Sequence, residues 1–410
     1  MKTEFLHQPS VSIRNLGDIF PDPLMKDYYF GLLKKLVSLN TDAVKKLNYE
    51  EASSLIANEL KRLGLDTKIV GEKVPNVVAR LDVGAEKDLA IVSHYDVVPA
   101  EGPWIVDGRE IDPFQPFELN GRLYGRGSAD DKSAIVASIW AMAELKDKRM
   151  KYNPLLIITG DEEVGGTGIR EVVSAGITGD LVLVADADIE YVGIGASGVV
   201  HGWIVVEGKE GHAGYPHRAT NPVNGLISLC SNLMRFAEKR ALTFSGLDSP
   251  PDSPISKVWG RFTFTILQAG GKHNVIPKEA KAGFDMRIVP GEDPYKAILE
   301  LKSEFEAIRQ RLGLDARLEI IEPINEGWMT DPQHPFVREA LNIYERLFGY
   351  KRVCGELGGN DGYIFSKRGK PTITLGAMRK ENNIHGRNEF VYLNDVVMLK
   401  EFIKGLLKGI

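Results

Sequence analysis

The sequence predicts an α/β protein in which a mostly parallel sheet is covered by helices and a smaller domain is inserted into the chain. Two observations predict this fold class. In the first half, short apolar runs of strand length alternate with segments of helical periodicity. After Gly198 the order of the expected elements changes to β-α-β-β-α-β, which is typical of a split βαβ domain.

The first half contains the elements expected to form the covered sheet. Residues 50–63 carry apolar side chains at helical spacing, and Gly64 follows as a typical helix stop. Short apolar strands that alternate with helices favour a parallel sheet covered on both faces. The other expected elements are strands at 76–81, 88–96, 154–160 and 181–187, and a largely buried helix at 132–145.

The second group of elements predicts the inserted domain. We expect it to span 198–322, and the flanking segments 1–197 and 323–410 to form the catalytic domain. Its expected elements are, in order, a strand at 199–208, a helix at 221–239, a Pro-rich loop at 245–256, strands at 261–270 and 278–289, a helix at 293–313, and a strand at 316–322.

Composition excludes several classes of protein. The formal net charge of the 410 residues is −5 and the basic residues are dispersed, which argues against a nucleic-acid-binding surface. Uncharged apolar runs such as 154–159 are far shorter than the roughly 20 residues of a membrane span. Residues 1–20 lack the apolar stretch of a secretory signal, and two isolated cysteines predict no disulfide framework. We therefore expect a cytoplasmic protein without nucleic-acid or membrane partners.

Acidic and histidine residues follow the expected strands where each one ends. Because loops after the carboxyl ends of parallel strands form the ligand sites of α/β sheets, we expect these side chains to gather at one place. They are His94 and Asp96, the pair Asp130 and Asp131, the pair Glu162 and Glu163, Asp186, and His385 near the C-terminal end.

These residue types together predict a dinuclear metal site. Zinc in proteins is held by carboxylates and neutral imidazoles, and one carboxylate can bridge two ions. His94 and Asp96 are two positions apart on an expected strand, so both side chains share a face and the carboxylate can orient the imidazole. Of two adjacent glutamates, one can bind metal while the other transfers the proton of a water.

Four motifs give the chain a resemblance to a known family. HYDVVP, GRGSADDK, GDEEVGG and NNIHGRNE resemble, in order and spacing, the co-catalytic zinc metallopeptidase and deacylase family. This family includes succinyl-diaminopimelate desuccinylase, acetylornithine deacetylase, glutamate carboxypeptidase, aminoacylase and carnosinase-like dipeptidases. The resemblance covers essentially the whole chain. It implies a zinc-exopeptidase-like catalytic domain and an inserted domain that serves as a lid and often as a dimer interface, so a homodimer is expected.

The resemblance also implies which residues bind the metal ions. His94 and Asp186 would bind the first ion, Glu163 and His385 would bind the second, and Asp130 would bridge both. Two divalent ions are implied, with zinc expected and cobalt suited to the same ligands.

Three neighbours of these ligands have other implied roles. Asp96 would orient His94, and Glu162 would be the general base and acid. Asp131 is interpreted as a residue of the helix start rather than as a ligand.

Five further site residues are implied outside the metal ligands. The segment GHAGYPHRATNP resembles the desuccinylase segment whose histidine, here His212, reaches into the partner subunit's active site and polarises the scissile carbonyl. Asn274 and Arg287 occupy the family's positions for residues that hold the substrate carboxylate, although Arg287 could instead be a solvent-facing strand residue. Backbone N–H groups at Gly358 and Gly359 could grip a carboxylate, or these glycines could simply form a turn.

The implied function is metal-dependent hydrolysis of an amide bond in an N-acyl amino acid or small peptide. The first substrate interpretation is succinyl-diaminopimelate, which would make the protein an enzyme of amino-acid biosynthesis. Dipeptidase, carboxypeptidase and acetylornithine deacetylase activities remain alternatives, because residue 186 is Asp, as in dipeptidase and aminopeptidase relatives, where the deacylases typically carry Glu. A non-catalytic metal-binding relative is the alternative of another class, and it is disfavoured because every candidate ligand and the base are present.

Overall fold

The computed structural model describes residues 22–410, and these residues form two compact units. The first unit comprises residues up to 192 together with 331–353 and 370–410, and the second comprises 193–330 and 354–369. The second unit therefore includes the segment 354–369 in addition to the whole of the predicted insertion. The N-terminal stretch in which no secretory signal is expected lies outside the described residues.

The sheet of the first unit contains the predicted parallel strands. Its order is β1-β2-β8-β3-β9-β21, in which β8, β3, β9 and β21 run parallel and β1 and β2 are antiparallel to their neighbours. The mostly parallel sheet expected from the sequence is confirmed. The strands are β1 (Asp66–Val70), β2 (Asn76–Arg80), β3 (Asp88–His94), β8 (Asn153–Thr159), β9 (Leu181–Val184) and β21 (Thr372–Thr374).

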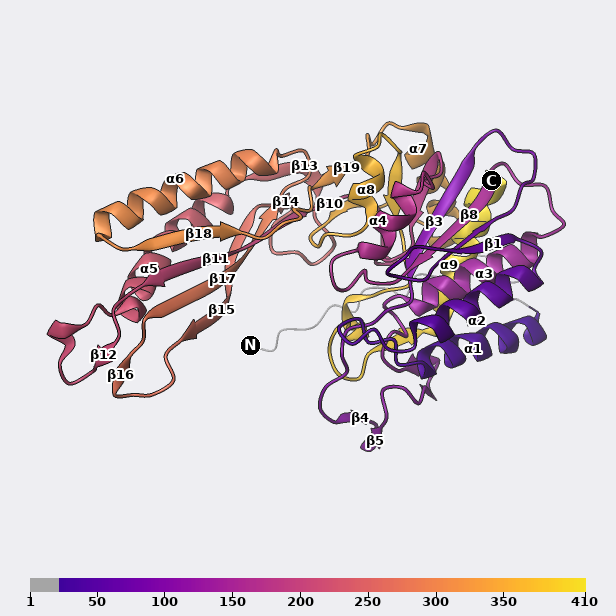
Figure 1. The fold of residues 1–410 in the computed structure, drawn as a ribbon. Helices are drawn as coiled ribbons and strands as arrows, with labels where there is room; N and C mark the ends of the chain where they lie inside the picture. Colours follow the sequence, from indigo (N-terminus) through magenta and orange to yellow (C-terminus); the bar gives the residue numbers. More distant parts are fainter. Residues whose placement is uncertain (1–21) are drawn as a thin grey trace, which may run out of the picture. The chain divides into compact units, whose positions relative to one another are not determined.

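Helices of the first unit pack on this sheet and on one another (Figure 1). Helix α3 packs against β3 and lies between α1 and α9, and nearly all of its side chains are buried because it is apolar around its whole circumference. This is the largely buried helix expected at 132–145. The helices are α1 (Pro23–Ser38), α2 (Tyr49–Arg62), α3 (Lys132–Leu145), α4 (Thr167–Ser174), α7 (Pro335–Phe348) and α9 (Leu393–Lys408).

Short strands beside the main sheet bring two distant segments of the first unit together. Strands β6 and β7 form a hairpin, and β22 pairs with the other side of β7. The chain just after His385 therefore lies beside the chain just before Asp130. These short strands are β4 (Trp104–Val106), β5 (Arg109–Ile111), β6 (Phe117–Leu119), β7 (Arg122–Tyr124) and β22 (Phe390–Tyr392).

The second unit is built around a four-stranded antiparallel sheet of order β15-β17-β11-β18. Helices α5 and α6 lie along one face of this sheet and form an apolar core with it (Figure 1). Its main elements follow the predicted β-α-β-β-α-β order: β11 (Gly198–Glu207), α5 (Pro222–Arg240), β15 (Arg261–Ala269), β17 (Glu279–Ile288), α6 (Pro294–Leu312) and β18 (Ala316–Ile320).

Smaller elements complete the second unit. The expectation of a loop throughout 245–256 is wrong in part, because β13 pairs with β14 and extends to Asp248. The remaining elements are β10 (Val192–Ala196), β12 (Gly211–His212), β13 (Phe244–Asp248), β14 (Lys257–Trp259), β16 (Val275–Ile276), β19 (Trp328–Met329), β20 (Val353–Glu356) and α8 (Gly362–Ser366).

Candidate metal centre

The predicted ligand residues of the first unit lie together at the carboxyl ends of its parallel strands. His94 is the last residue of β3, Glu163 follows β8, and Asp186 follows β9. Asp130 lies just before α3, and His385 lies in the loop before β22. Strand order therefore explains the cluster, because β8, β3 and β9 are neighbours in the sheet and end on the same edge.

Asp130 lies between the two imidazoles. Its Oδ1 is 3.0 Å from His94 Nε2, and its Oδ2 is 3.0 Å from His385 Nε2. A second carboxylate faces the same nitrogen of each imidazole, since Asp186 Oδ2 is 3.9 Å from His94 Nε2 and Glu163 Oε2 is 3.1 Å from His385 Nε2. One carboxylate thus faces both histidines with one oxygen each, which is the arrangement a bridging ligand needs.

Two groups of side chains in this cluster have the composition and spacing of metal ligands. His94, Asp131 and Asp186 form one group, and His94, Asp130 and Glu163 form the other. Within each group, one candidate ligand atom per residue lies within 4.8 Å of the others. Imidazole and carboxylate donors at such separations suit zinc and similar divalent ions.

The cluster has more carboxylates than imidazoles, and this excess keeps positive charge on the histidines. Hydrogen bonds to Asp130 and Glu163 raise the pKa of His385 to about 10. Burial opposes a charged His94, but its hydrogen bonds to Asp130 and Asp96 outweigh burial and hold the pKa well above its ordinary value. In the same way, burial would raise the pKa of Asp130, but the two imidazoles lower it. Such a concentration of carboxylates favours the binding of a divalent cation, whose charge offsets theirs.

Asp96 contacts both sides of the cluster. His94 Nδ1 is 3.0 Å from the backbone oxygen of Asp96 and 3.4 Å from its Oδ1. Both acceptors favour a proton on Nδ1, which leaves Nε2 free to bind a metal ion. The same carboxylate accepts the backbone N–H groups of Glu162 and Glu163, each at 3.2 Å. Asp96 therefore joins the end of β3 to the loop after β8.

Asp131 differs in part from its interpretation as a residue of the helix start. It occupies the position before α3, but its side chain makes no capping hydrogen bond. Its Oδ2 instead accepts the backbone N–H of His94 at 3.2 Å, while its Oδ1 is buried without a hydrogen-bond partner. Burial, reinforced by the nearby Asp186, raises the pKa of this carboxyl group well above its ordinary value.

The remaining predicted site residues lie in the second unit. His212 is in β12, which pairs with β16, and the backbone oxygen of Asn274 accepts the N–H of Ala213 at 2.9 Å. Hence the chain at His212 and the chain at Asn274 are neighbours. His212 Nδ1 accepts the N–H of Gly214 at 3.0 Å, so a neutral His212 carries its proton on Nε2.

Arg261, which the sequence analysis did not single out, lies beside Arg287 and contacts the loop of Gly358 and Gly359. Arg287 makes two contacts with Asp285, from Nε at 2.8 Å and from Nη2 at 3.0 Å. Arg261, opposite Arg287 in the neighbouring strand, donates to the backbone oxygen of Leu357 at 2.7 Å. Arg261 thereby holds the exposed loop that contains Gly358 and Gly359.

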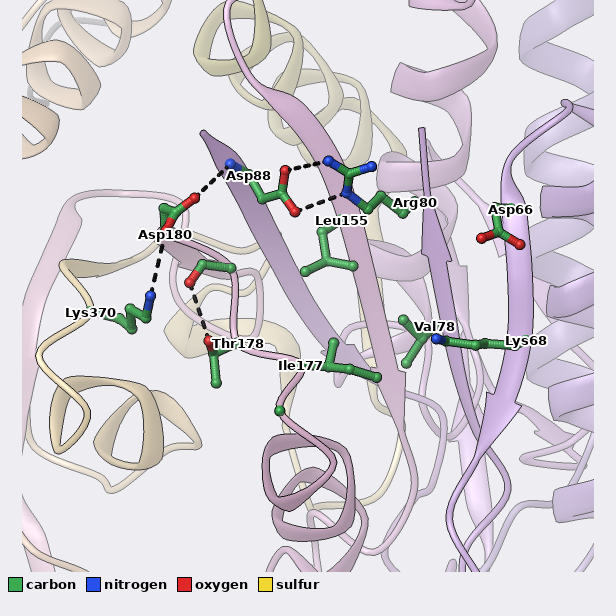
Figure 2. A pocket seen from close by; sticks show the side chains of 12 residues that line it. Asp66, Lys68, Val78, Arg80, Asp88, Leu155, Ile177, Thr178, Asp180 and Lys370 are labelled. Carbon is green, nitrogen blue, oxygen red and sulfur yellow. Dashed lines mark hydrogen bonds and ion pairs between the residues drawn. The ribbon is translucent and has the colours of Figure 1, made fainter. Parts of the chain in front are cut away.

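A pocket at the other end of the parallel strands has a different character (Figure 2). It has a volume of about 330 Å³ and lies where β3 and β9 begin. Figure 2 shows two pairs of opposite charge among its residues: Arg80 contacts Asp88 with two nitrogens, each at 2.9 Å, and Lys370 lies 3.5 Å from Asp180. Its residues lack the histidines of the cluster, and ligand sites of such sheets form at the opposite edge.

Comparisons with known proteins agree with the class of protein that this fold and cluster define, a metal-dependent hydrolase. The profile of peptidase family M20/M25/M40 matches residues 90–409, and the chain belongs to this family. The sequence-based prediction of a metallopeptidase or metallo-amidohydrolase is thereby confirmed.

Relatives in the family include named enzymes. A succinyl-diaminopimelate desuccinylase of Parvibaculum lavamentivorans is 35% identical over 346 residues, which cover 82% of this chain and 83% of the relative. The desuccinylase of Bordetella parapertussis is 29% identical over 375 residues, covering 88% and 93%.

Among solved structures, an M20 family metallo-carboxypeptidase of Sulfolobus solfataricus has a TM-score of 0.77 at 19% identity, covering 93% of this chain and 98% of that one. A di-peptidase of Saccharomyces cerevisiae has a TM-score of 0.76 at 18% identity, covering 94% and 96%. At these identities the structural similarity supports the fold.

Within residues 22–410, none of the helices combines the length and the apolarity needed to cross a bilayer.

Proposed function

We propose that the protein hydrolyses the amide bond of a small N-acyl amino acid, with succinyl-diaminopimelate as the first substrate to test. The observation that carries the reaction type is the position of Asp130 between His94 and His385, with Asp186 and Glu163 facing the same Nε2 nitrogens. The substrate is suggested by the relatives named succinyl-diaminopimelate desuccinylase, which align along most of the chain.

The donor set fits two divalent ions, and zinc is proposed. His94 and Asp186 would hold the first ion, Glu163 and His385 the second, and Asp130 would contact both. Asp131 offers a further oxygen near the first position, because it forms a candidate ligand group with His94 and Asp186 and its buried Oδ1 lacks a hydrogen-bond partner. Bound there, the ions would supply Lewis-acid activation of a water and of the amide carbonyl.

The protein's own groups would handle the proton. Glu162 would take a proton from the attacking water and then donate it to the nitrogen of the leaving amine, so that one carboxylate serves both steps. Asp96 supports this role because it holds the backbone N–H of Glu162, and the neighbouring amide of Glu163, at 3.2 Å. The loop after β8 is therefore anchored at both glutamates.

We further propose that the protein is a homodimer in which His212 acts in the partner's site. A neutral His212 donates from Nε2, which is the form that can stabilise a developing oxyanion. Large apolar side chains are exposed on helix α5, at Ile227 and Met234, and on β15, at Ile266 and Leu267. Within the described residues β15 is an edge strand of its sheet, so both elements offer surface to a second copy.

Substrate carboxylates would be bound by Arg287 and Asn274, with the N–H groups of Gly358 and Gly359 as further donors. Asp285 occupies the Nε–H and one N–H of Nη2 of Arg287, which leaves the two N–H groups of Nη1 and the second of Nη2 to donate to a substrate. A dipeptidase or carboxypeptidase is the second candidate, favoured by Asp at position 186 and by the folds of the structural neighbours. A cytoplasmic location is also proposed, and two free cysteines agree with it.

Metal content and a substrate panel test this function together. The purified protein should contain about two divalent ions per chain and lose activity reversibly on chelation. Succinyl-diaminopimelate, acetylornithine and a set of dipeptides should then be compared by kcat/KM. Activity that survives exhaustive chelation would refute the reaction type, whereas a preference for dipeptides would refute only the substrate.

A further inference from the structure

A buried ion pair joins the two segments that supply Asp130 and His385. Arg126 Nη1 lies 2.5 Å from Glu389 Oε2, and the two side chains are only 3% and 0% exposed. Arg126 precedes Asp130 by four positions, and Glu389 follows His385 by four. The pair thus connects two segments that are 263 positions apart in the chain.

Both members of the pair also hold the backbone beside a candidate ligand. Glu389 Oε1 accepts the N–H of Ala129 at 3.1 Å and the N–H of Asp130 itself at 3.3 Å. Arg126 Nη2 donates to the backbone oxygen of Gly386 at 2.9 Å, directly after His385. The side chains so connected meet in the cluster, where His385 Nε2 lies 3.0 Å from Asp130 Oδ2.

The cost of burying these charges indicates a role beyond stability. Removing two charged side chains from water has a large free-energy cost, and apolar replacements of a buried pair are often neutral or stabilising. A buried pair is therefore weak evidence for stability. The contacts of this pair with the backbone on both sides point instead to the geometry of the two ligand loops. The pair extends the β7–β22 pairing, which ends at Tyr124 and Phe390, towards these loops.

We propose that Arg126 and Glu389 are positioning residues that hold Asp130 and His385 at the separation needed by the second metal ion. This inference rests on the proposed function. The first ion would depend less on the pair, because His94 and Asp186 are carried by the ends of β3 and β9. For the second ion, by contrast, two of the three proposed ligands belong to the segments that the pair joins.

Glu389→Gln is the main test. The amide keeps the shape of the side chain but has only one acceptor oxygen. Its NH₂ group would face N–H donors, either those of Arg126 or those of Ala129 and Asp130. The affinities of the full-length, zinc-loaded protein are measured by competition with a chelator. The affinity of the variant for the second ion should be about 10–100-fold lower than that of the parent, which is the usual effect of changing a residue that hydrogen-bonds to a metal ligand. The first ion should be affected less, and at saturating zinc kcat should return towards that of the parent.

Two further variants separate positioning from charge and from folding. Glu144 forms another largely buried pair, with Lys400 at 2.8 Å, and lies at the opposite end of α3 from Asp130. Glu144→Gln should therefore leave the affinities for both ions unchanged. Arg126→Lys keeps the charge and lacks the fork that reaches Glu389 and Gly386 together, so it should weaken the second ion even if Glu389→Gln folds poorly.

The double variant Arg126→Met/Glu389→Gln gives the sharpest outcome. Without a buried uncompensated charge its melting temperature should recover, while the affinity for the second ion should stay low. If that affinity recovers with the melting temperature, or if Glu389→Gln and Arg126→Lys bind both ions as the parent does, the positioning role is overturned. A parent protein that binds fewer than two ions would instead overturn the proposed function.

Discussion

Replacing Asp96 by Asn should impair catalysis by an amount that can be worked out from its contacts. The fully buried carboxylate accepts the N–H groups of Glu162 and Glu163 and faces Nδ1 of His94. Asparagine has a single acceptor oxygen, so one N–H loses its partner and faces an NH₂ group. A hydrogen bond to a charged group contributes about 1.5–3 kcal/mol. Since 1.4 kcal/mol is a factor of ten, kcat/KM should fall by roughly 10- to 150-fold.

The assay is steady-state hydrolysis at saturating zinc, with metal content and melting temperature measured in parallel. Asp88→Asn is the matched control, because Asp88 begins the same strand and its partners Arg80 and Asn153 lie at the edge of the sheet away from the cluster. The reasoning would be refuted if Asp96→Asn retained the kcat/KM of the Asp88→Asn variant.

The remaining predictions concern the base, the shared site and a thiol. Glu162→Gln should keep its metal while kcat falls roughly 10²–10⁴-fold, and Glu163→Gln should lose metal; the reverse pattern would exchange the two roles. His212→Ala should lower kcat by about 10²-fold, and mixing it with Glu162→Gln should restore activity through mixed dimers; no recovery after subunit exchange would exclude a shared site. Burial raises the pKa of the Cys230 thiol to about 11, so between pH 8 and 10 the thiolate fraction grows about tenfold per pH unit. The rate of its reaction with a disulfide reagent should grow by the same factor, and a rate independent of pH would contradict this.

Periodicity predicted the elements well where one local rule governs them. The helix at 132–145 has the bounds expected from its continuous apolar character, and β3 ends at His94 within the predicted strand. His94, Glu163 and Asp186 gather as expected because each ends or follows a strand of the same parallel group. Here the fold class constrains positions that are far apart in the chain.

Features that depend on long-range pairing could not be predicted from the sequence. The Pro-rich composition of 245–256 concealed β13, whose strand character depends on its pairing with β14. Asp131 was placed correctly before a helix, but its bond to the His94 backbone depends on how α3 packs near β3. Arg126 and Glu389 appear in two of the recognised motifs, yet neither motif alone indicates that their side chains meet.

The separation of those two residues also determines the order in which the site can assemble during synthesis. Arg126 and Glu389 are 263 positions apart, and ribosomes add roughly 5–20 residues per second, so Glu389 is made about 13–50 s after Arg126. Throughout that interval the loop of Asp130 lacks the carboxylate that accepts its N–H groups. The metal centre is therefore a late product of folding, and a nascent chain should gain its affinity for a second ion only once the segment of His385 and Glu389 has left the ribosome.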